Sequence, residues 1–112
     1  MSSPPIFFPR TLGEACEILS DYDGQAKVVA GSTALSLLMG QKLVDPEALV
    51  SLSRIGDLDQ ITVTDGVLTL GALVTHAEVD RSDVVREHAP VLAQSFAVVG
   101  NARIRAAATV GG

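Results

Sequence analysis

The chain has 112 residues, of which 47% are hydrophobic and only 4% aromatic, and its formal net charge is −5. This is the size of one ordinary domain, and its core must be built from aliphatic side chains, which suits a layered α/β structure. The negative charge argues against a nucleic acid or an anionic membrane surface as partner. Because no apolar run approaches the roughly 18 residues of a membrane span and the first residues lack signal-peptide features, we expect a cytoplasmic protein with no membrane span.

The first half of the chain predicts helices that alternate with short strands. Thr11 and Glu14 match a capping box, which marks the start of a helix. Cys16 follows the apolar spacing of that helix, so we expect its side chain to be buried. A single cysteine can neither form a disulfide within the chain nor hold an iron–sulfur cluster. The expected elements are a strand or tether at 6–9, a helix at 11–21, strands at 27–30 and 48–52, and a helix at 33–39 between these two strands.

The second half predicts a hairpin followed by helices. Asp65-Gly66 lies between two alternating apolar runs, which is a strong hairpin signal. Thr75 is a plausible N-cap, and Pro90 begins a helix that is apolar almost all round, with Gly100-Asn101 as its C-cap pair. The expected elements are strands at 60–64 and 67–71 and helices in the latter part of 72–79, at 82–88 and at 90–99, with 104–108 ambiguous.

This order of elements favours an α/β (α+β) fold with a mixed sheet and helices packed against it. A purely parallel Rossmann domain fits poorly, because the hairpin interrupts the alternation and the G-x-G-x-x-G fingerprint is absent.

The stretch Val28–Leu38 predicts a buried strand, a tight turn of small residues and then a helix. Such a turn points backbone N–H groups and the positive end of a helix at one spot, which suits an anion and most often a phosphate. An ordinary short-looped helix start would give the same pattern, with Ser32 or Thr33 as N-cap in either case. A second small-residue turn, Thr109–Gly112, would serve the same phosphates, although glycines at a chain end are often frayed.

No side-chain constellation for catalysis is present in the sequence. His76 and His88 lack partners at metal-ligand spacing, so we expect surface or helix-cap histidines and no metal site. There is no arranged carboxylate pair and no G-x-S-x-G elbow, so any catalysis would depend on a cofactor. Arg103 and Arg105 precede the last turn, either as exposed arginines or with one of them approaching a phosphate or a docking partner.

Six short motifs occur in a fixed order along the chain and can be compared as a set with known families. They occupy residues 8–15, 28–35, 52–55, 70–79, 100–105 and 109–112. In this order and spacing they resemble the N-terminal part of the flavin-binding medium subunit of the molybdenum hydroxylases. That group includes aerobic carbon monoxide dehydrogenase and the FAD domains of xanthine dehydrogenase.

The resemblance implies the N-terminal subdomain of an FAD-binding domain of the vanillyl-alcohol-oxidase or p-cresol-methylhydroxylase type, in which both turns wrap the FAD diphosphate. It implies an iron–sulfur small subunit and a molybdopterin large subunit as partners, with the flavin relaying electrons from the clusters to an acceptor. No catalytic residue is assigned within this stretch, because the sequence shows no catalytic constellation. The cofactor-binding positions that the resemblance carries over are Lys27, Val29, Ala30, Gly31, Ser32, Thr33, Ala34, Leu35, Thr109, Val110, Gly111 and Gly112.

The chain also departs from the family pattern. Ser32 replaces a usual second glycine, Ala34 replaces a usual Ser or Asp, and Ala106 replaces a common Asn. Because the family continues with a second flavin subdomain, we expect residues 1–112 to be an N-terminal FAD-binding subdomain truncated before it. The alternative is a small α/β interaction module that oligomerises through the apolar helix at 91–99 and binds no flavin.

Overall fold

The computed structural model describes residues 4–30 and 45–112. The chain divides into two compact units, a first unit of residues 1–56 and a second unit of residues 57–112. The helix expected at 33–39 lies outside the described residues.

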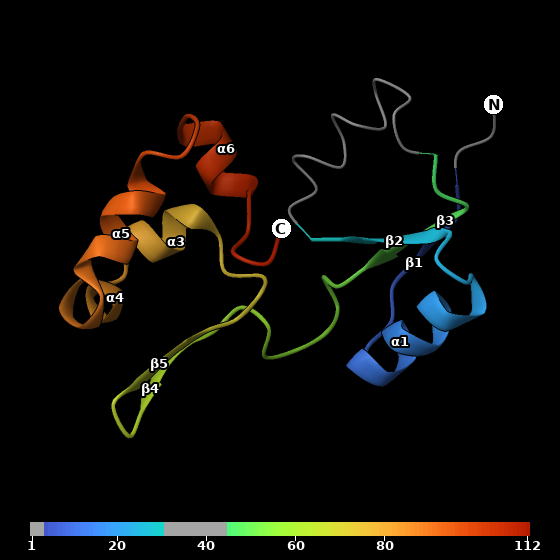
Figure 1. The fold of residues 1–112 in the computed structure, drawn as a ribbon, viewed down its shortest axis with the longest axis horizontal. Helices are drawn as coiled ribbons and strands as arrows, with labels where there is room; N and C mark the ends of the chain where they lie inside the picture. The colour runs from blue at the N-terminus through green and yellow to red at the C-terminus, as the bar shows by residue number, and fades with distance from the viewer. Residues whose placement is uncertain (1–3, 31–44) are drawn as a thin grey trace. The chain divides into compact units, whose positions relative to one another are not determined.

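The first unit contains a three-stranded parallel sheet. Its strands are β1 (Ile6–Phe7), β2 (Ala26–Val29) and β3 (Ala48–Ser51), in the order β1-β3-β2 (Figure 1). Both pairs are parallel, and Val29 pairs with Ser51. The central strand is the most buried, as expected for a strand with a neighbour on each side. The apolar run at 6–9 is therefore a strand and not a tether.

Helix α1 (Leu12–Asp21) packs against β2 and β3. The Thr11 hydroxyl accepts the Glu14 N–H at 3.1 Å, so Thr11 is the N-cap, as the predicted capping box requires. The reciprocal half of the box is absent, because the Glu14 carboxylate accepts the Arg10 N–H at 3.0 Å. Ala15 is the buried residue of this helix, and Cys16 is exposed. The expectation of a buried Cys16 was wrong because consecutive helical residues point about 100° apart. Only a narrow stripe through Ala15 faces the sheet.

The second unit begins with the antiparallel hairpin of β4 (Ile61–Thr64) and β5 (Val67–Leu70), as predicted. Asp65 and Gly66 have φ values of 51° and 78°, and positive φ at both central residues is what a type I′ turn requires. Four short helices follow the hairpin (Figure 1). They are α3 (His76–Arg81), α4 (Asp83–His88), α5 (Pro90–Ala97) and α6 (Ala102–Ala107).

The core of the second unit lies between the helices and the hairpin. Its buried residues are Val74, Val79, Val85 and Ala93, and leucines and an isoleucine of the hairpin pack against them. Thr75 and Ser82 are the N-caps of α3 and α4. Local capping signals therefore located both helix starts.

The end of α5 differs from the expectation. The helix stops at Ala97, and Asn101 is the N-cap of α6, where its side chain accepts the Ile104 N–H at 3.0 Å. Asn101 is therefore not a C-cap, and the ambiguous stretch at 104–108 belongs largely to a helix. The apolar helix is also less buried than its composition suggests, because Val91 and Val98 are 73% and 77% exposed.

The α/β fold class is confirmed. In the described part of the chain, the parallel and the antiparallel strand pairs form two separate sheets. No helix in residues 4–30 or 45–112 is long and apolar enough to cross a bilayer.

Candidate cofactor site

The first predicted turn leaves the carboxyl edge of the parallel sheet. β2 ends at Val29, and the Leu52 N–H donates to the Val29 carbonyl at 3.1 Å, which fixes this end beside β3. In open α/β sheets, ligands bind outside the carboxyl ends of the strands. Lys27 is exposed, and Val29 and Ala30 are half-buried. The five remaining predicted positions, Gly31–Leu35, lie outside the described residues.

A pair of serine hydroxyls lies at the same edge. Ser51 is the last residue of β3 and is 8% exposed, and its Oγ lies 2.9 Å from the Oγ of Ser53. The Ser53 N–H also donates to the Ser51 Oγ, at 3.3 Å. Sequence reasoning placed Ser51 in the strand expected at 48–52 and assigned no role to either hydroxyl. The signal that could have found the pair is two hydroxyl residues at the end of a fully apolar strand.

The second predicted turn, Thr109–Gly112, is held by backbone hydrogen bonds within the second unit. The N–H groups of Val110 and Gly111 donate to the carbonyls of Val74 and Ala72, both at 2.9 Å. The Gly112 N–H donates to the Thr109 carbonyl at 3.2 Å, and the Thr109 hydroxyl donates to the Gly112 carbonyl at 2.6 Å. Three of the amides expected to face a phosphate are therefore already hydrogen-bonded inside the protein.

Two features of this turn still suit a cofactor. The Thr109 N–H has no acceptor among the described residues, although Thr109 is only 8% exposed and bridges to Thr75. Gly111 lies so close to Ala72 that a Cβ would meet the Ala72 Cβ at 2.8 Å and its carbonyl oxygen at 3.0 Å. Glycine is thus required by packing here, and it leaves an exposed backbone that a ligand can approach.

The other singled-out residues take structural positions. The guanidinium of Arg105 donates to the carbonyls of Val99 and Gly100 at 3.2 and 3.1 Å, so it holds the corner between α5 and α6. Arg103 is exposed. The His76 ring is half-buried, lies edge-on to Phe96 with ring centroids 4.6 Å apart, and has a buried Nδ1 with no partner among the described residues.

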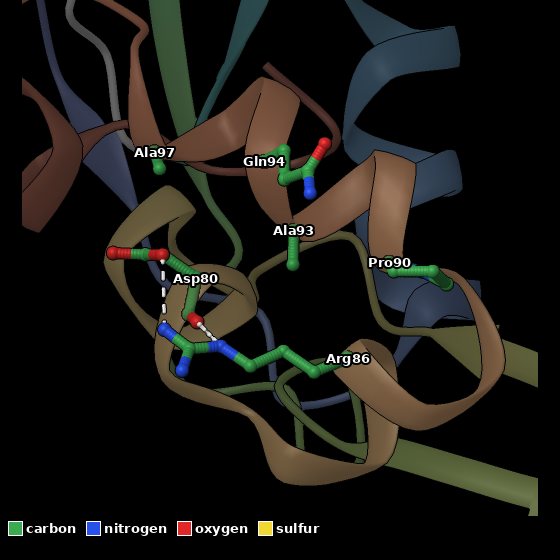
Figure 2. Close-up of a pocket in the computed structure, with 6 residues that line it drawn as sticks. All are labelled: Asp80, Arg86, Pro90, Ala93, Gln94 and Ala97. Carbon is green, nitrogen blue, oxygen red and sulfur yellow. Dashed lines mark hydrogen bonds and ion pairs between the residues drawn. The ribbon is translucent and has the colours of Figure 1, made fainter.

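A pocket of about 380 Å³ lies among α3, α4 and α5 (Figure 2). Its cation, Arg86, donates through Nε to the Asp80 carbonyl at 2.8 Å and places Nη2 3.4 Å from the Asp80 carboxylate. The guanidinium is therefore already paired with an anion. The pocket contains none of the predicted site residues; it is lined by Asp80, Arg86, Pro90, Ala93, Gln94 and Ala97.

Each unit carries donors of the kind that bind phosphate. In the first unit the hydroxyls of Ser51 and Ser53 lie at the carboxyl edge of the sheet, next to the first predicted segment, and in the second unit the Thr109 N–H lies at the glycine-rich turn. No group of three or more histidine, cysteine or acidic residues in the described segments could hold a metal ion.

Comparison with known families agrees with this donor set. Residues 2–112 match the family described as "FAD binding domain in molybdopterin dehydrogenase". The chain belongs to this family. The resemblance predicted from the motifs is thereby confirmed, and the match covers nearly the whole chain.

The similar proteins are named as dehydrogenases or oxidoreductases. The chain is 31% identical to the 6-hydroxypseudooxynicotine dehydrogenase complex subunit alpha of Paenarthrobacter nicotinovorans, over 97% of this chain and 38% of the relative. It is 29% identical to the carbon monoxide dehydrogenase medium chain of Hydrogenophaga pseudoflava, over 97% and 39%. The chain also superposes on a chain in the crystal structure of quinoline 2-oxidoreductase from Pseudomonas putida 86, with a TM-score of 0.93 and 32% identity. The match covers 99% of this chain and 39% of that chain.

This member of the FAD-binding family spans less than two fifths of the length of these relatives. It is homologous to FAD subunits of oxidoreductase complexes. The comparisons name the family, and the individual binding residues stay predictions.

Proposed function

We propose that this chain binds FAD as part of a molybdenum hydroxylase medium subunit. The observation that carries the proposal is the family match over residues 2–112, joined to spare hydrogen-bond donors at the carboxyl edge of a parallel sheet. The diphosphate is proposed to bind at Lys27–Leu35 and at Thr109–Gly112. In the second segment, the Thr109 N–H is the proposed donor, because the other amides are already hydrogen-bonded. The glycines of that segment have no side chain, so the diphosphate can approach the backbone closely.

The proposed role of the subunit is electron relay. Bound FAD supplies a ring system that accepts and releases electrons. This chain's own residues bind and orient the diphosphate end of the cofactor, and none of them is assigned a proton-transfer or nucleophilic role. The proposed partners are an iron–sulfur small subunit, which delivers electrons, and a molybdopterin large subunit, which oxidises the substrate.

The direct test is a titration of the purified chain with FAD, followed by calorimetry and by flavin absorbance. We expect saturable binding of FAD and competition by ADP, which carries the same diphosphate. The same titration with the remaining part of a relative's FAD subunit added in trans should strengthen binding. If FAD fails to bind in both experiments, the proposal is wrong.

A second candidate function is protein binding without flavin. The observation that favours it is the exposure of Val91 and Val98, which lie two helical turns apart on or just after α5. Size-exclusion mass distinguishes the candidates. A colourless oligomer that does not bind FAD would favour protein binding as the function. A chain that binds FAD favours the first function, whatever its oligomeric state.

A further inference from the structure

The serine pair at the end of β3 has a hydrogen-bond donor to spare. Each hydroxyl carries one proton and can accept two hydrogen bonds. The contact of 2.9 Å between the Oγ atoms of Ser51 and Ser53 uses one of the two protons, whichever residue donates it. The other proton has no acceptor among the described residues. Ser51 is buried and Ser53 is exposed, so the pair reaches the surface at the edge of the sheet, where a ligand can accept the spare proton.

Arg54 adds fixed positive charge to the same corner. Its guanidinium carbon lies 4.6 Å from the centroid of the Phe8 ring, in a cation–π contact that leaves the N–H groups unused. Among the residues that the structure describes, Arg54 makes neither an ion pair nor a hydrogen bond through its side chain. Its side chain is exposed, so its five N–H donors are open to a ligand, and arginine binds phosphate through such a planar fork.

Ser51, Ser53 and Arg54 lie beside the first segment of the proposed cofactor site. Ser51 ends β3, and Phe8, which contacts Arg54, directly follows β1. Because β2 is parallel to β3 and ends at Val29, these residues lie at the edge where all three parallel strands end. Of the acidic side chains on α1, that of Glu14 accepts the Arg10 N–H at 3.0 Å through its Oε2.

We propose that Ser51, Ser53 and Arg54 bind a phosphate oxygen of the FAD diphosphate. The inference rests on the proposed function and extends it, because all three residues lie outside the positions predicted from the sequence. The hydroxyl pair donates its spare proton to the oxygen, and the Arg54 fork supplies the countercharge in a chain whose net charge is −5.

The test uses the full chain and three ligands: FAD, ADP, which has the diphosphate without the flavin, and riboflavin, which has the flavin without phosphate. Arg54→Met keeps an apolar stem over Phe8 and removes the charge, and Ser51→Ala removes one hydroxyl. Arg81→Met and Ser95→Ala are matched controls, because they remove the same groups from helices of the second unit. Circular dichroism melts establish that each variant is folded.

We expect Arg54→Met to weaken FAD and ADP binding roughly tenfold or more, and Ser51→Ala to weaken it about three- to tenfold. Arg54→Lys should give an intermediate loss, because it keeps the charge and loses the planar fork. Riboflavin binding and both control variants should be unchanged.

Each contrary result has a distinct meaning. If the unmodified chain binds FAD and the variants bind ADP with unchanged affinity, this inference is overturned and the proposed function stands. A loss of riboflavin affinity as large as the loss for ADP would overturn the assignment to phosphate. If the unmodified chain binds neither FAD nor ADP, the proposed function fails and this inference fails with it.

Discussion

The two candidate binding regions offer hydrogen-bond donors in different ways. In the first unit, the edge where β2 and β3 end carries hydroxyl and guanidinium donors that have no acceptor among the described residues. In the second unit, the N–H groups of Val110, Gly111 and Gly112 in the last turn donate to carbonyls of the same unit. The comparison teaches that a glycine-rich turn need not have free amides, and that unused donors can lie instead at the end of a strand.

The largest effect should come from the tightest backbone contact of the second unit. A Cβ on Gly71 would overlap the carbonyl of Leu58, which belongs to the backbone and cannot swing aside. We expect Gly71→Ala to lower the free energy of unfolding by at least about 3 kcal/mol. Gly56→Ala is the control, because a Cβ there meets nothing within 4 Å. Chemical denaturation measures both, and equal stabilities would contradict the packing described for Gly71.

Cavity variants test whether the two units are separate cooperative structures. Val50 in β3 and Val85 in α4 are both fully buried, each in its own unit. Truncation of either to alanine should cost about 2 kcal/mol. Native-state hydrogen exchange should show lost protection only in the unit that carries the substitution. Equal loss in both units from either variant would contradict the division.

A smaller effect is expected at the last turn. Gly111→Ala places a Cβ 2.8 Å from the Cβ of Ala72, which can move only together with its own backbone, so the cost in unfolding free energy should be about 1.5 kcal/mol. The same variant should weaken FAD binding, because it thickens the surface that the cofactor approaches. A stability loss with unchanged FAD affinity would remove this turn from the proposed site.

The smallest effect is expected at the pocket in Figure 2. Arg86 and Asp80 have side chains that are 57% and 35% exposed, so water screens their ion pair. Arg86→Met should change the free energy of unfolding by no more than about 0.5 kcal/mol, with FAD affinity unchanged. Arg81→Met serves as the comparison on a neighbouring helix. A clear loss of FAD affinity in Arg86→Met would move the cofactor site toward this pocket.

The sequence predicted the features that depend on neighbouring residues. Helix capping at Thr11 and Thr75 and the turn at Asp65-Gly66 depend on residues only a few positions away. These features can therefore be predicted without the tertiary structure. Exposure of Cys16 was missed because it depends on which narrow stripe of α1 meets the sheet.

The candidate site was predictable only in part for the same reason. Small residues at Thr109–Gly112 indicate a tight turn, but the carbonyls of Ala72 and Val74 that receive its amides lie more than thirty residues away in the chain. The Ser51–Ser53 pair gives no periodic signal. Its importance follows from the strand order β1-β3-β2, which is set by long-range pairing.

The central claim is that the diphosphate of FAD binds at the carboxyl edge of the parallel sheet and at the last turn. Amide chemical-shift mapping of the full chain by NMR, during titration with FAD, tests it most directly. The account predicts that the largest shifts fall on Val29–Ala30, Ser51–Arg54 and Thr109–Gly112. Shifts confined to the amides around Asp80, Arg86 and Gln94, with these three segments unmoved, would contradict it.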